Sequence, residues 1–209
     1  VEKLMDAQVP ERAQRIRVIL TELNRIASHL LFFGTGLLDI GALTPYFYTN
    51  REREKILEIF EMVSGVRMNY GYFRVGGLYR DVPDEFEAAV REFLEYFPPM
   101  IKQYDAAFLG NKIFVDRTKG VGVLTREQAI DYGLTGPSLR AAGVPLDFRK
   151  AQPYRGYEED EFDVPTSPDG DTYSRFMMRY YELTESLRII EQARNKLKPG
   201  PVKDAGRRI

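Results

Sequence analysis

The chain has 209 residues, of which 44% are hydrophobic, and its formal net charge is −1. This composition allows one sizeable core, and the near-neutral charge argues against a dedicated nucleic-acid binder, which normally carries a basic face. The lack of cysteine excludes disulfides, zinc–thiolate sites, iron–sulfur ligation by this chain and cysteine nucleophiles, and a single histidine argues against multi-histidine metal sites and Ser-His-Asp chemistry.

The first predicted element is a long helix from about Pro10 to Asp39. Apolar residues recur behind Pro10 at helical spacing, whereas Arg15 and Glu22 are assigned to another face. From residue 26 to residue 43 the sequence is apolar on all sides, which predicts burial all round. Its longest uncharged run is too short to cross a bilayer.

Asp39 and His29 are the only ionisable side chains in that apolar stretch. Leu31, Thr35 and Asp39 are each four residues apart, so they share one helix face. Two interpretations remain open for Asp39: the polar end of a narrow apolar pocket, or a core carboxylate paired with an arginine. His29 lies ten residues earlier and points elsewhere, so we expect a hydrogen-bonded core histidine.

A second helix is predicted to begin at Thr44-Pro45 and to end at Gly65. Residues 70–75 are aromatic and are expected to form a short strand or a turn. Asp84 is expected to cap a helix that runs to about Tyr96. Pro98-Pro99 should then kink the chain into a further helix through Phe108.

The segment from residue 113 to residue 123 is expected to be a strand or irregular. Thr125 opens a short helix with a capping-box pattern. Residues 133–171 are rich in Gly, Pro, Arg and Tyr without helical periodicity, and such a long irregular segment is usually functional or packed against a partner. Asp171 is predicted to cap a final helix that runs to about Leu197.

Three motif-like stretches carry no chemistry in our interpretation. Residues 133–143 lack the Gly-Lys-Ser/Thr ending of a phosphate loop. Gly34-Thr35-Gly36 lacks the third glycine of a dinucleotide fingerprint, because Asp39 stands there, and it lies inside a helix. The acidic run from residue 158 to residue 161 is expected to be a solvated surface rather than a metal site.

Several segments in order resemble one known family, and each is quoted as it stands in this chain. They are VPERAQRIRVILTELNRIASHLLFFGTGLLDIGALTPYFYTNRERE, EMVSGVRM, FRVGGLYRDVP, VGV, LTGPSLRAAGV, DFRKAQPYRGYEEDEFDVP and ESLRIIEQARNKLKPGP. Together they cover essentially the whole chain and resemble the D-type subunit of the proton-pumping NADH–quinone oxidoreductase, bacterial respiratory complex I, whose mitochondrial counterpart is the 49-kilodalton subunit.

The resemblance implies a mainly α fold, the helical core of a protein related to the large subunit of nickel–iron hydrogenases, with short β or irregular segments. Residues 1–209 would be the central helical part of a longer subunit, since both ends look like cuts through a longer protein. Several residues are expected to be mostly buried in that core. They are Leu23, Ile26, Leu30, Phe60, Leu183, Leu187 and Ile190.

The resemblance also implies a site. The family aspartate that pairs with a quinone-binding histidine matches Asp39, which we expect to be buried beside an apolar channel or beside the place of that upstream histidine hairpin. Positions that line the quinone channel match Leu31, Thr35 and Tyr46. That histidine and a second headgroup ligand, a tyrosine, precede this chain in the family.

Arg67 and Asn69 match the stretch that lies near the terminal cluster in the family. Many members have a histidine where this chain has Asn69, and asparagine cannot gain a proton near neutral pH. The resemblance therefore predicts a cluster potential with little pH dependence, which would suit a low-potential acceptor such as menaquinone.

By this resemblance the chain would bind quinone and hold no redox cofactor or metal of its own. Iron–sulfur clusters and FMN would belong to partner subunits, chiefly the subunit with the terminal [4Fe–4S] cluster and the 30-kilodalton-type subunit, at the cytoplasmic side of the bacterial inner membrane. The isolated chain would be inactive. Two alternatives remain, a nickel–iron hydrogenase-type large subunit and a helical assembly scaffold without a site.

Overall fold

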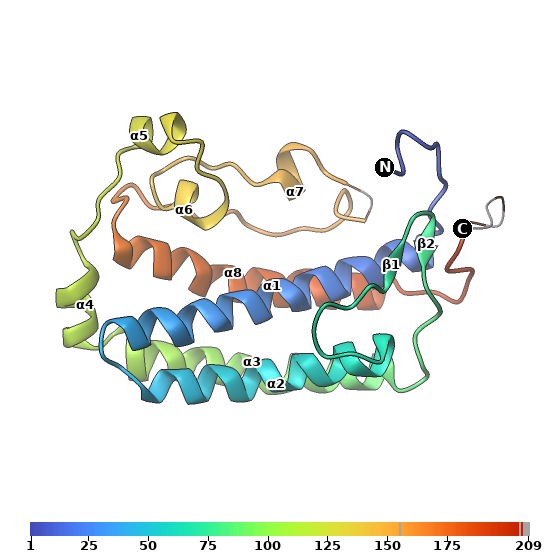
Figure 1. Cartoon of the computed structure of the whole chain (residues 1–209), viewed down its shortest axis with the longest axis horizontal. Helices are drawn as coiled ribbons and strands as arrows, with labels where there is room; N and C mark the ends of the chain where they lie inside the picture. The colour runs from blue at the N-terminus through green and yellow to red at the C-terminus, as the bar shows by residue number, and fades with distance from the viewer. Residues whose placement is uncertain (155, 205, 207–209) are drawn as a thin grey trace.

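The computed structural model describes residues 1–154, 156–204 and 206. Its core is a bundle of long helices (Figure 1), which confirms the expected mainly α fold. The helices α1 and α8 pack along one another, and α1 also packs against α2, which in turn contacts α3. Their bounds are Glu11–Asp39 for α1, Thr44–Ser64 for α2, Phe86–Tyr104 for α3 and Thr172–Asn195 for α8.

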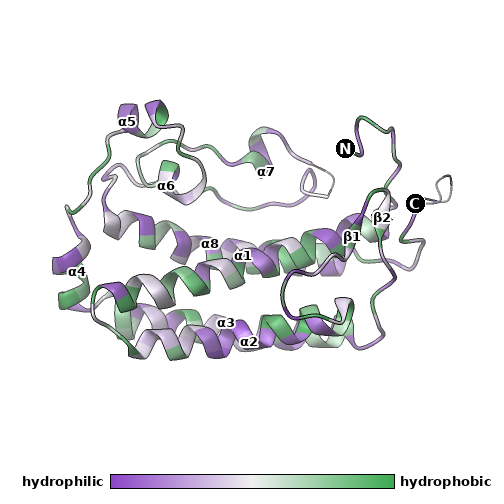
Figure 2. Ribbon diagram, viewed as in Figure 1, coloured by the Kyte–Doolittle hydropathy of each residue, from purple (hydrophilic) through white to green (hydrophobic). Residues whose placement is uncertain are grey.

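The bundle core is built from the apolar faces of these helices. Hydrophobic and hydrophilic residues alternate along α1 and α2 (Figure 2), as expected for helices with one buried side. The seven residues that were named individually as core residues are all buried. They are Leu23, Ile26, Leu30, Phe60, Leu183, Leu187 and Ile190.

Two glycines inside α1 let neighbouring helices come close. A Cβ added to Gly34 would lie 2.6 Å from Oγ1 of Thr49 on α2, and one added to Gly36 would lie 2.7 Å from the ring of Phe176 on α8. Real Cβ atoms do not approach other atoms so closely. The helix-propensity cost of the two glycines is therefore offset by tight packing of α1 on both sides.

The second helix follows its sequence signals, but the third does not. Pro45 lies in the first turn of α2, and Gly65 ends it with φ +82°. The expected cap at Asp84 is wrong, since α3 begins at Phe86 without a side-chain cap. The helix also continues through Pro98 and Pro99, and the π-helix η1, Asp105–Leu109, follows it.

A small β-hairpin lies at the end of the bundle where the chain starts (Figure 1). Its strands are β1, Phe73–Arg74, and β2, Gly77–Leu78, which pair antiparallel. Lys203 forms a β-bridge with Gly77 on the far side of β2, so the hairpin joins the C-terminal segment to the fold. The expected strand or turn before Gly76-Gly77 is thereby confirmed.

Two short helices lie between α3 and the irregular segment. The expectation of a strand or irregular segment over residues 113–123 is wrong for residues 113–118, which belong to the helix α4, Lys112–Thr118. Asn111 caps this helix, since its side chain accepts the Ile113 N–H. Residues 119–123 are irregular, as expected. The capping box at Thr125 is confirmed, with Gln128 completing it at the start of α5, Arg126–Asp131.

The Gly- and Pro-rich segment covers α1 and α8 on one side (Figure 1). It is irregular apart from α6, Gly136–Arg140, and α7, Phe148–Ala151. Asp171 caps α8 as predicted, because its Oδ1 accepts the Ser174 N–H at 2.7 Å. In the described ranges, no helix has the length and apolar character needed to span a membrane.

Candidate functional site

One side of α1 is left uncovered by α2, α8 and the irregular segment. We call it the open face. Its first five members are spaced three or four residues apart, the sixth follows the fifth directly, and all six are exposed. They are Asn24, Ser28, Leu31, Thr35, Leu38 and Asp39. The shared face of Leu31, Thr35 and Asp39 is therefore confirmed, and the structure adds three neighbours to it.

Asp39 lies at the last residue of α1 and is exposed. The expectation that this carboxylate is buried is wrong for this chain, because its side of the helix has no covering element. Its carboxylate forms no ion pair or side-chain hydrogen bond with any residue that the structure describes. The alternative interpretation, a core aspartate paired with arginine, is therefore also wrong.

The position of Asp39 is electrostatically unfavourable for the helix. The C-terminal end of a helix carries a partial negative charge, and an anion there costs about 0.3–1 kcal/mol. The last turn of α1 contains no basic residue to compensate. Arg117 from α4 donates to the carbonyl oxygen of Ile40 and so neutralises part of the helix end, but not the carboxylate. Local structure therefore gives no reason for an aspartate at this position.

Large apolar side chains are exposed around Asp39. Leu31 is 42% exposed, Leu38 41%, Leu43 54% and Phe47 62%. The prediction of burial on every side of this stretch is wrong, since these residues face solvent. A contiguous exposed apolar surface usually marks a ligand or partner site. A cavity of about 310 Å³ lies behind the turn and is lined in part by Leu37, Ile40 and Phe108.

Tyr46 stands beside the open face in the first turns of α2. Its side chain is half-buried, and its Cδ2 would be 3.3 Å from a Cβ on Gly34. It thus packs next to the residue that precedes Thr35. The structure brings Tyr46 to the border of the open face, on the α2 side.

Arg67 and Asn69 lie near the other end of the open face. The Tyr70 hydroxyl donates to Oδ1 of Asn24 at 2.6 Å, which fixes this loop against α1. Arg67 pairs with Glu61 at 2.8 Å and with Glu54, so its charge is balanced.

Along α1, Asn24 and Asp39 are separated by about 22 Å, at 1.5 Å per residue. The two groups of predicted site residues therefore occupy opposite ends of one face.

His29 is buried on the side of α1 away from the open face. Its Nε2 lies 2.8 Å from Oε2 of Glu182, which confirms the expected core histidine. Burial lowers the pKa of His29, and the Glu182 carboxylate only partly opposes this. Burial would raise the pKa of Glu182, but the hydrogen bond from His29 and the charge of Arg140 lower it to about 2. The pair is therefore a neutral imidazole donating to a carboxylate.

Glu22 continues the same buried network towards the irregular segment. Its carboxylate is fully buried and accepts from Arg149 at 3.0 Å, Tyr157 at 2.6 Å and Ser186 at 2.7 Å. The assignment of Glu22 and Arg15 to an outward face is wrong, because both are buried. A usable signal existed in the sequence: Glu22 is four residues before Ile26 and so shares its face.

The acidic run is only partly solvated. Asp160 is buried and pairs with Lys196 at 2.8 Å and with Arg15 at 3.5 Å, whereas its three acidic neighbours are exposed. The expectation of a solvated surface is therefore wrong at Asp160. No cluster of three or more potential metal ligands occurs in the described part of the chain.

Comparison with known proteins gives a consistent result. Residues 39–209 match the family described as respiratory-chain NADH dehydrogenase, 49 Kd subunit. The chain is 57% identical over its full length to the D-type subunit of NADH-quinone oxidoreductase from Deinococcus radiodurans, of which it covers 52%. It is 54% identical over its full length to the corresponding subunit of Thermus thermophilus, covering 51%, and 52% identical over 97% of its length to that of Geotalea uraniireducens, covering 52%. The chain thus spans about half the length of these relatives.

Proposed function

Because the chain belongs to the family of the 49-kilodalton subunit of respiratory-chain NADH dehydrogenase, the D-type subunit of NADH–quinone oxidoreductase, we propose that its open face forms one wall of the site where quinone is reduced. The enzyme would be the proton-pumping complex, in which electrons from NADH reach quinone through partner subunits. This chain would supply binding groups and no redox centre.

The observation that carries the proposal is the state of Asp39. It is an exposed carboxylate without an ion-pair partner in the described residues, at a helix end that disfavours negative charge, surrounded by exposed leucines. A quinone has an apolar body and two polar oxygens, so a face that combines Leu31 and Leu38 with Thr35 and Asp39 suits it chemically.

In this proposal each site residue has one role. Leu31 and Tyr46 contact the apolar body of the quinone, and Thr35 offers a hydroxyl, although in this structure that hydroxyl donates to the Leu31 carbonyl at 2.9 Å. Asp39 orients and charge-balances a histidine proton donor that lies outside these 209 residues. Arg67 and Asn69 lie towards the terminal cluster.

The remaining wall would come from partner subunits. The subunit with the terminal [4Fe–4S] cluster would cover the open face, and the 30-kilodalton-type subunit would be a second neighbour. FMN and the iron–sulfur clusters would lie in partners, at the cytoplasmic side of the bacterial inner membrane. No observation favours the hydrogenase-type or scaffold alternatives, and the experiment below also tests the scaffold.

The test is Asp39→Asn in the assembled enzyme. We expect quinone reductase activity to fall by about 10²-fold or more, because the protonated histidine loses the charge that stabilises it. NADH oxidation by an artificial upstream acceptor should be unchanged. Asp131→Asn is a matched control, since Asp131 is an exposed aspartate at the end of α5, far from α1 in Figure 1.

Two results would contradict the proposal. Equal loss of both activities in Asp39→Asn would indicate a folding or assembly role for this residue. Unchanged quinone reductase activity would exclude Asp39 from the site and favour the scaffold alternative.

A further inference from the structure

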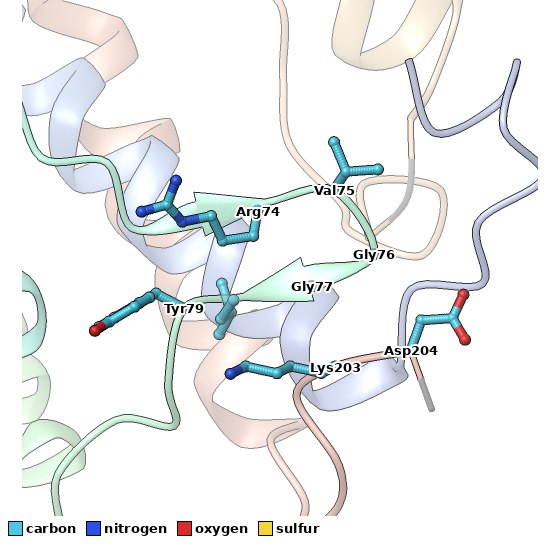
Figure 3. Close-up of a pocket in the computed structure, with 8 residues that line it drawn as sticks. Arg74, Val75, Gly76, Gly77, Tyr79, Lys203 and Asp204 are labelled. Atoms are coloured by element: carbon cyan, nitrogen blue, oxygen red, sulfur yellow. The ribbon is translucent and has the colours of Figure 1, made fainter. Parts of the chain in front are cut away.

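The hairpin at the end of the bundle carries a second feature, independent of the open face. A pocket of about 270 Å³ lies between the hairpin and the C-terminal segment, lined by Arg74, Gly76, Gly77, Tyr79 and Lys203 among others. Figure 3 shows Arg74 and Lys203 extending on opposite sides of Tyr79, with their charged ends on the same side of the hairpin. The Asp204 carboxylate points the other way.

Each of the two cations lies against the aromatic ring of Tyr79. The Arg74 guanidinium lies 5.6 Å from the ring centroid of Tyr79, and the Lys203 ammonium lies 5.9 Å from it. At exposed sites such cation–π contacts stabilise the positions of the charged groups weakly. They place two positive charges and the Tyr79 hydroxyl around one opening.

Neither cation has a carboxylate partner among the described residues. The neighbouring arginines differ in this respect: Arg17 pairs with Glu2 at 2.8 Å, and Arg12 pairs with Asp81 at 3.0 Å. The Arg74 side chain also donates no hydrogen bond to any described residue. Among the described lining residues, Arg74 and Lys203 outnumber the single carboxylate, that of Asp204, so this part of the pocket has excess positive charge and unused donors.

The frame of the pocket is rigid, although its charged side chains are exposed. Arg17 donates to the carbonyl oxygens of Arg74 at 2.6 Å and of Gly77 at 2.7 Å, which ties both strands to α1. A Cβ on Gly77 would lie 2.0 Å from the Val202 carbonyl oxygen, so only glycine permits this contact. The backbone that carries the donors is thus fixed before any ligand arrives.

We propose that Arg74, Tyr79 and Lys203 form a docking site for an acidic side chain of a partner protein. Guanidinium and ammonium groups favour carboxylates, and two cations with no carboxylate partner among the described residues give charge complementarity to an acidic segment. The inference rests on the chain acting as a subunit and not on quinone chemistry at Asp39.

The test is zero-length carbodiimide coupling in the assembled enzyme. This reagent joins a lysine amine to a carboxylate only when the two are in contact. We expect mass spectrometry of the digest to show Lys203 joined to an Asp or Glu of another chain. Lys203→Arg keeps the charge and should abolish the coupled peptide without weakening association.

Charge reversal provides a second measurement. Lys203→Glu and Arg74→Glu should each weaken retention of the partner by about tenfold, read as dissociation at lower salt. Lys119→Glu is the control, since Lys119 is an exposed lysine at the end of α4, at the opposite end of the bundle in Figure 1, and should have no effect.

The proposal is overturned if Lys203 couples only to carboxylates of its own chain, or if it stays as reactive to acetylation in the assembled enzyme as in the free subunit. It is also overturned if both charge reversals behave like Lys119→Glu. None of these results depends on quinone reductase activity, so they leave the proposed role of Asp39 to its own test.

Discussion

Among single residues, Asn69 stands out by its backbone. Its φ is +57°, a left-handed conformation that asparagine, aspartate and histidine adopt more readily than other non-glycine residues. The side chain is exposed and lies one residue from the Tyr70 contact with α1. A histidine, which the family resemblance places here in many members, is therefore compatible with the local structure.

Asn69→His should make the midpoint potential of the terminal cluster in the assembled enzyme depend on pH. An imidazole with a pKa near 6.5 would titrate between about pH 6 and 8, and its proton would favour the reduced cluster. The midpoint potential should therefore be higher at low pH and fall by up to about 59 mV for each unit that the pH rises. Redox titrations followed by electron paramagnetic resonance measure this. Asn69→Gln should show the same weak pH dependence of the midpoint potential that we predict for the native enzyme. A native potential that already varies strongly with pH would show that another group has this role.

The buried His29–Glu182 pair should make stability fall with acid. The folded-state pKa of His29 is lowered, so below about pH 6.5 the unfolded chain binds a proton that the folded chain resists. The pKa of Glu182 is lowered to about 2, so its contribution is present above about pH 4.3 and is lost as the pH falls towards 2.

His29→Gln separates the two effects. The glutamine amide can still donate to Glu182 but does not titrate, so the loss of stability that begins below about pH 6.5 should disappear while the loss below about pH 4.3 remains. Urea unfolding at a series of pH values measures both. If the loss that begins below about pH 6.5 persists in the variant, another group causes it.

Among the elements, four helix ends with local signals were predictable from sequence, although Asp84 failed as the cap of α3. Pro10, Gly65, Asp171 and the capping box at Thr125 each act within one helical turn, and their helices begin or end where expected. The end of α3 was not predictable in this way. Two prolines break its internal hydrogen bonds, yet packing against the bundle keeps it helical, and this contribution is not visible in local sequence.

Gly34→Ala tests the packing of α1 against α2. Alanine favours a helix by about 1 kcal/mol over glycine, but the added methyl would overlap the Thr49 hydroxyl and press on Tyr46. We expect a net destabilisation of about 1–3 kcal/mol, since overpacking exceeds the propensity gain. Denaturant unfolding measures this. Ser28→Ala, on the open face of the same helix, should be neutral or slightly stabilising. Stabilisation by Gly34→Ala would show that α2 can move away freely.

For the whole molecule, the buried charges join the irregular segment to the bundle. Arg140 pairs with Glu182 of α8, and Arg149 pairs with Glu22 of α1 and with Asp147. These buried pairs could not be predicted because charged helical residues were assigned to solvent, although their spacing matched that of apolar neighbours.

The sequence did identify residues of the open face, but not that they are exposed. Their exposure depends on which sides of α1 pack against other elements of the fold.

Glu22→Gln should loosen the irregular segment from the bundle. The substitution leaves Arg149 with Asp147 alone and places an amide among several donors, so we expect a loss of about 3–5 kcal/mol. Hydrogen exchange should rise more in residues 145–160 than in α1. Glu54→Gln, which removes an exposed pair with Arg67, should cost at most about 1 kcal/mol. Equal protection of residues 145–160 in both variants would show that the network does not attach this segment.

The division of α1 into a buried side and an open face predicts how substitutions along this helix should act. If every position is substituted in turn and scored separately for subunit abundance and for turnover, the two effects should each recur with the helical period. The positions that lower abundance should lie on the opposite side of the helix from those that lower turnover. Abundance should fall at Glu22, His29 and Gly36, whereas turnover at normal abundance should fall at Leu31, Thr35 and Asp39. One helix would thus carry two nearly independent sets of constraints, one imposed by its own fold and one by the molecules that meet its open face.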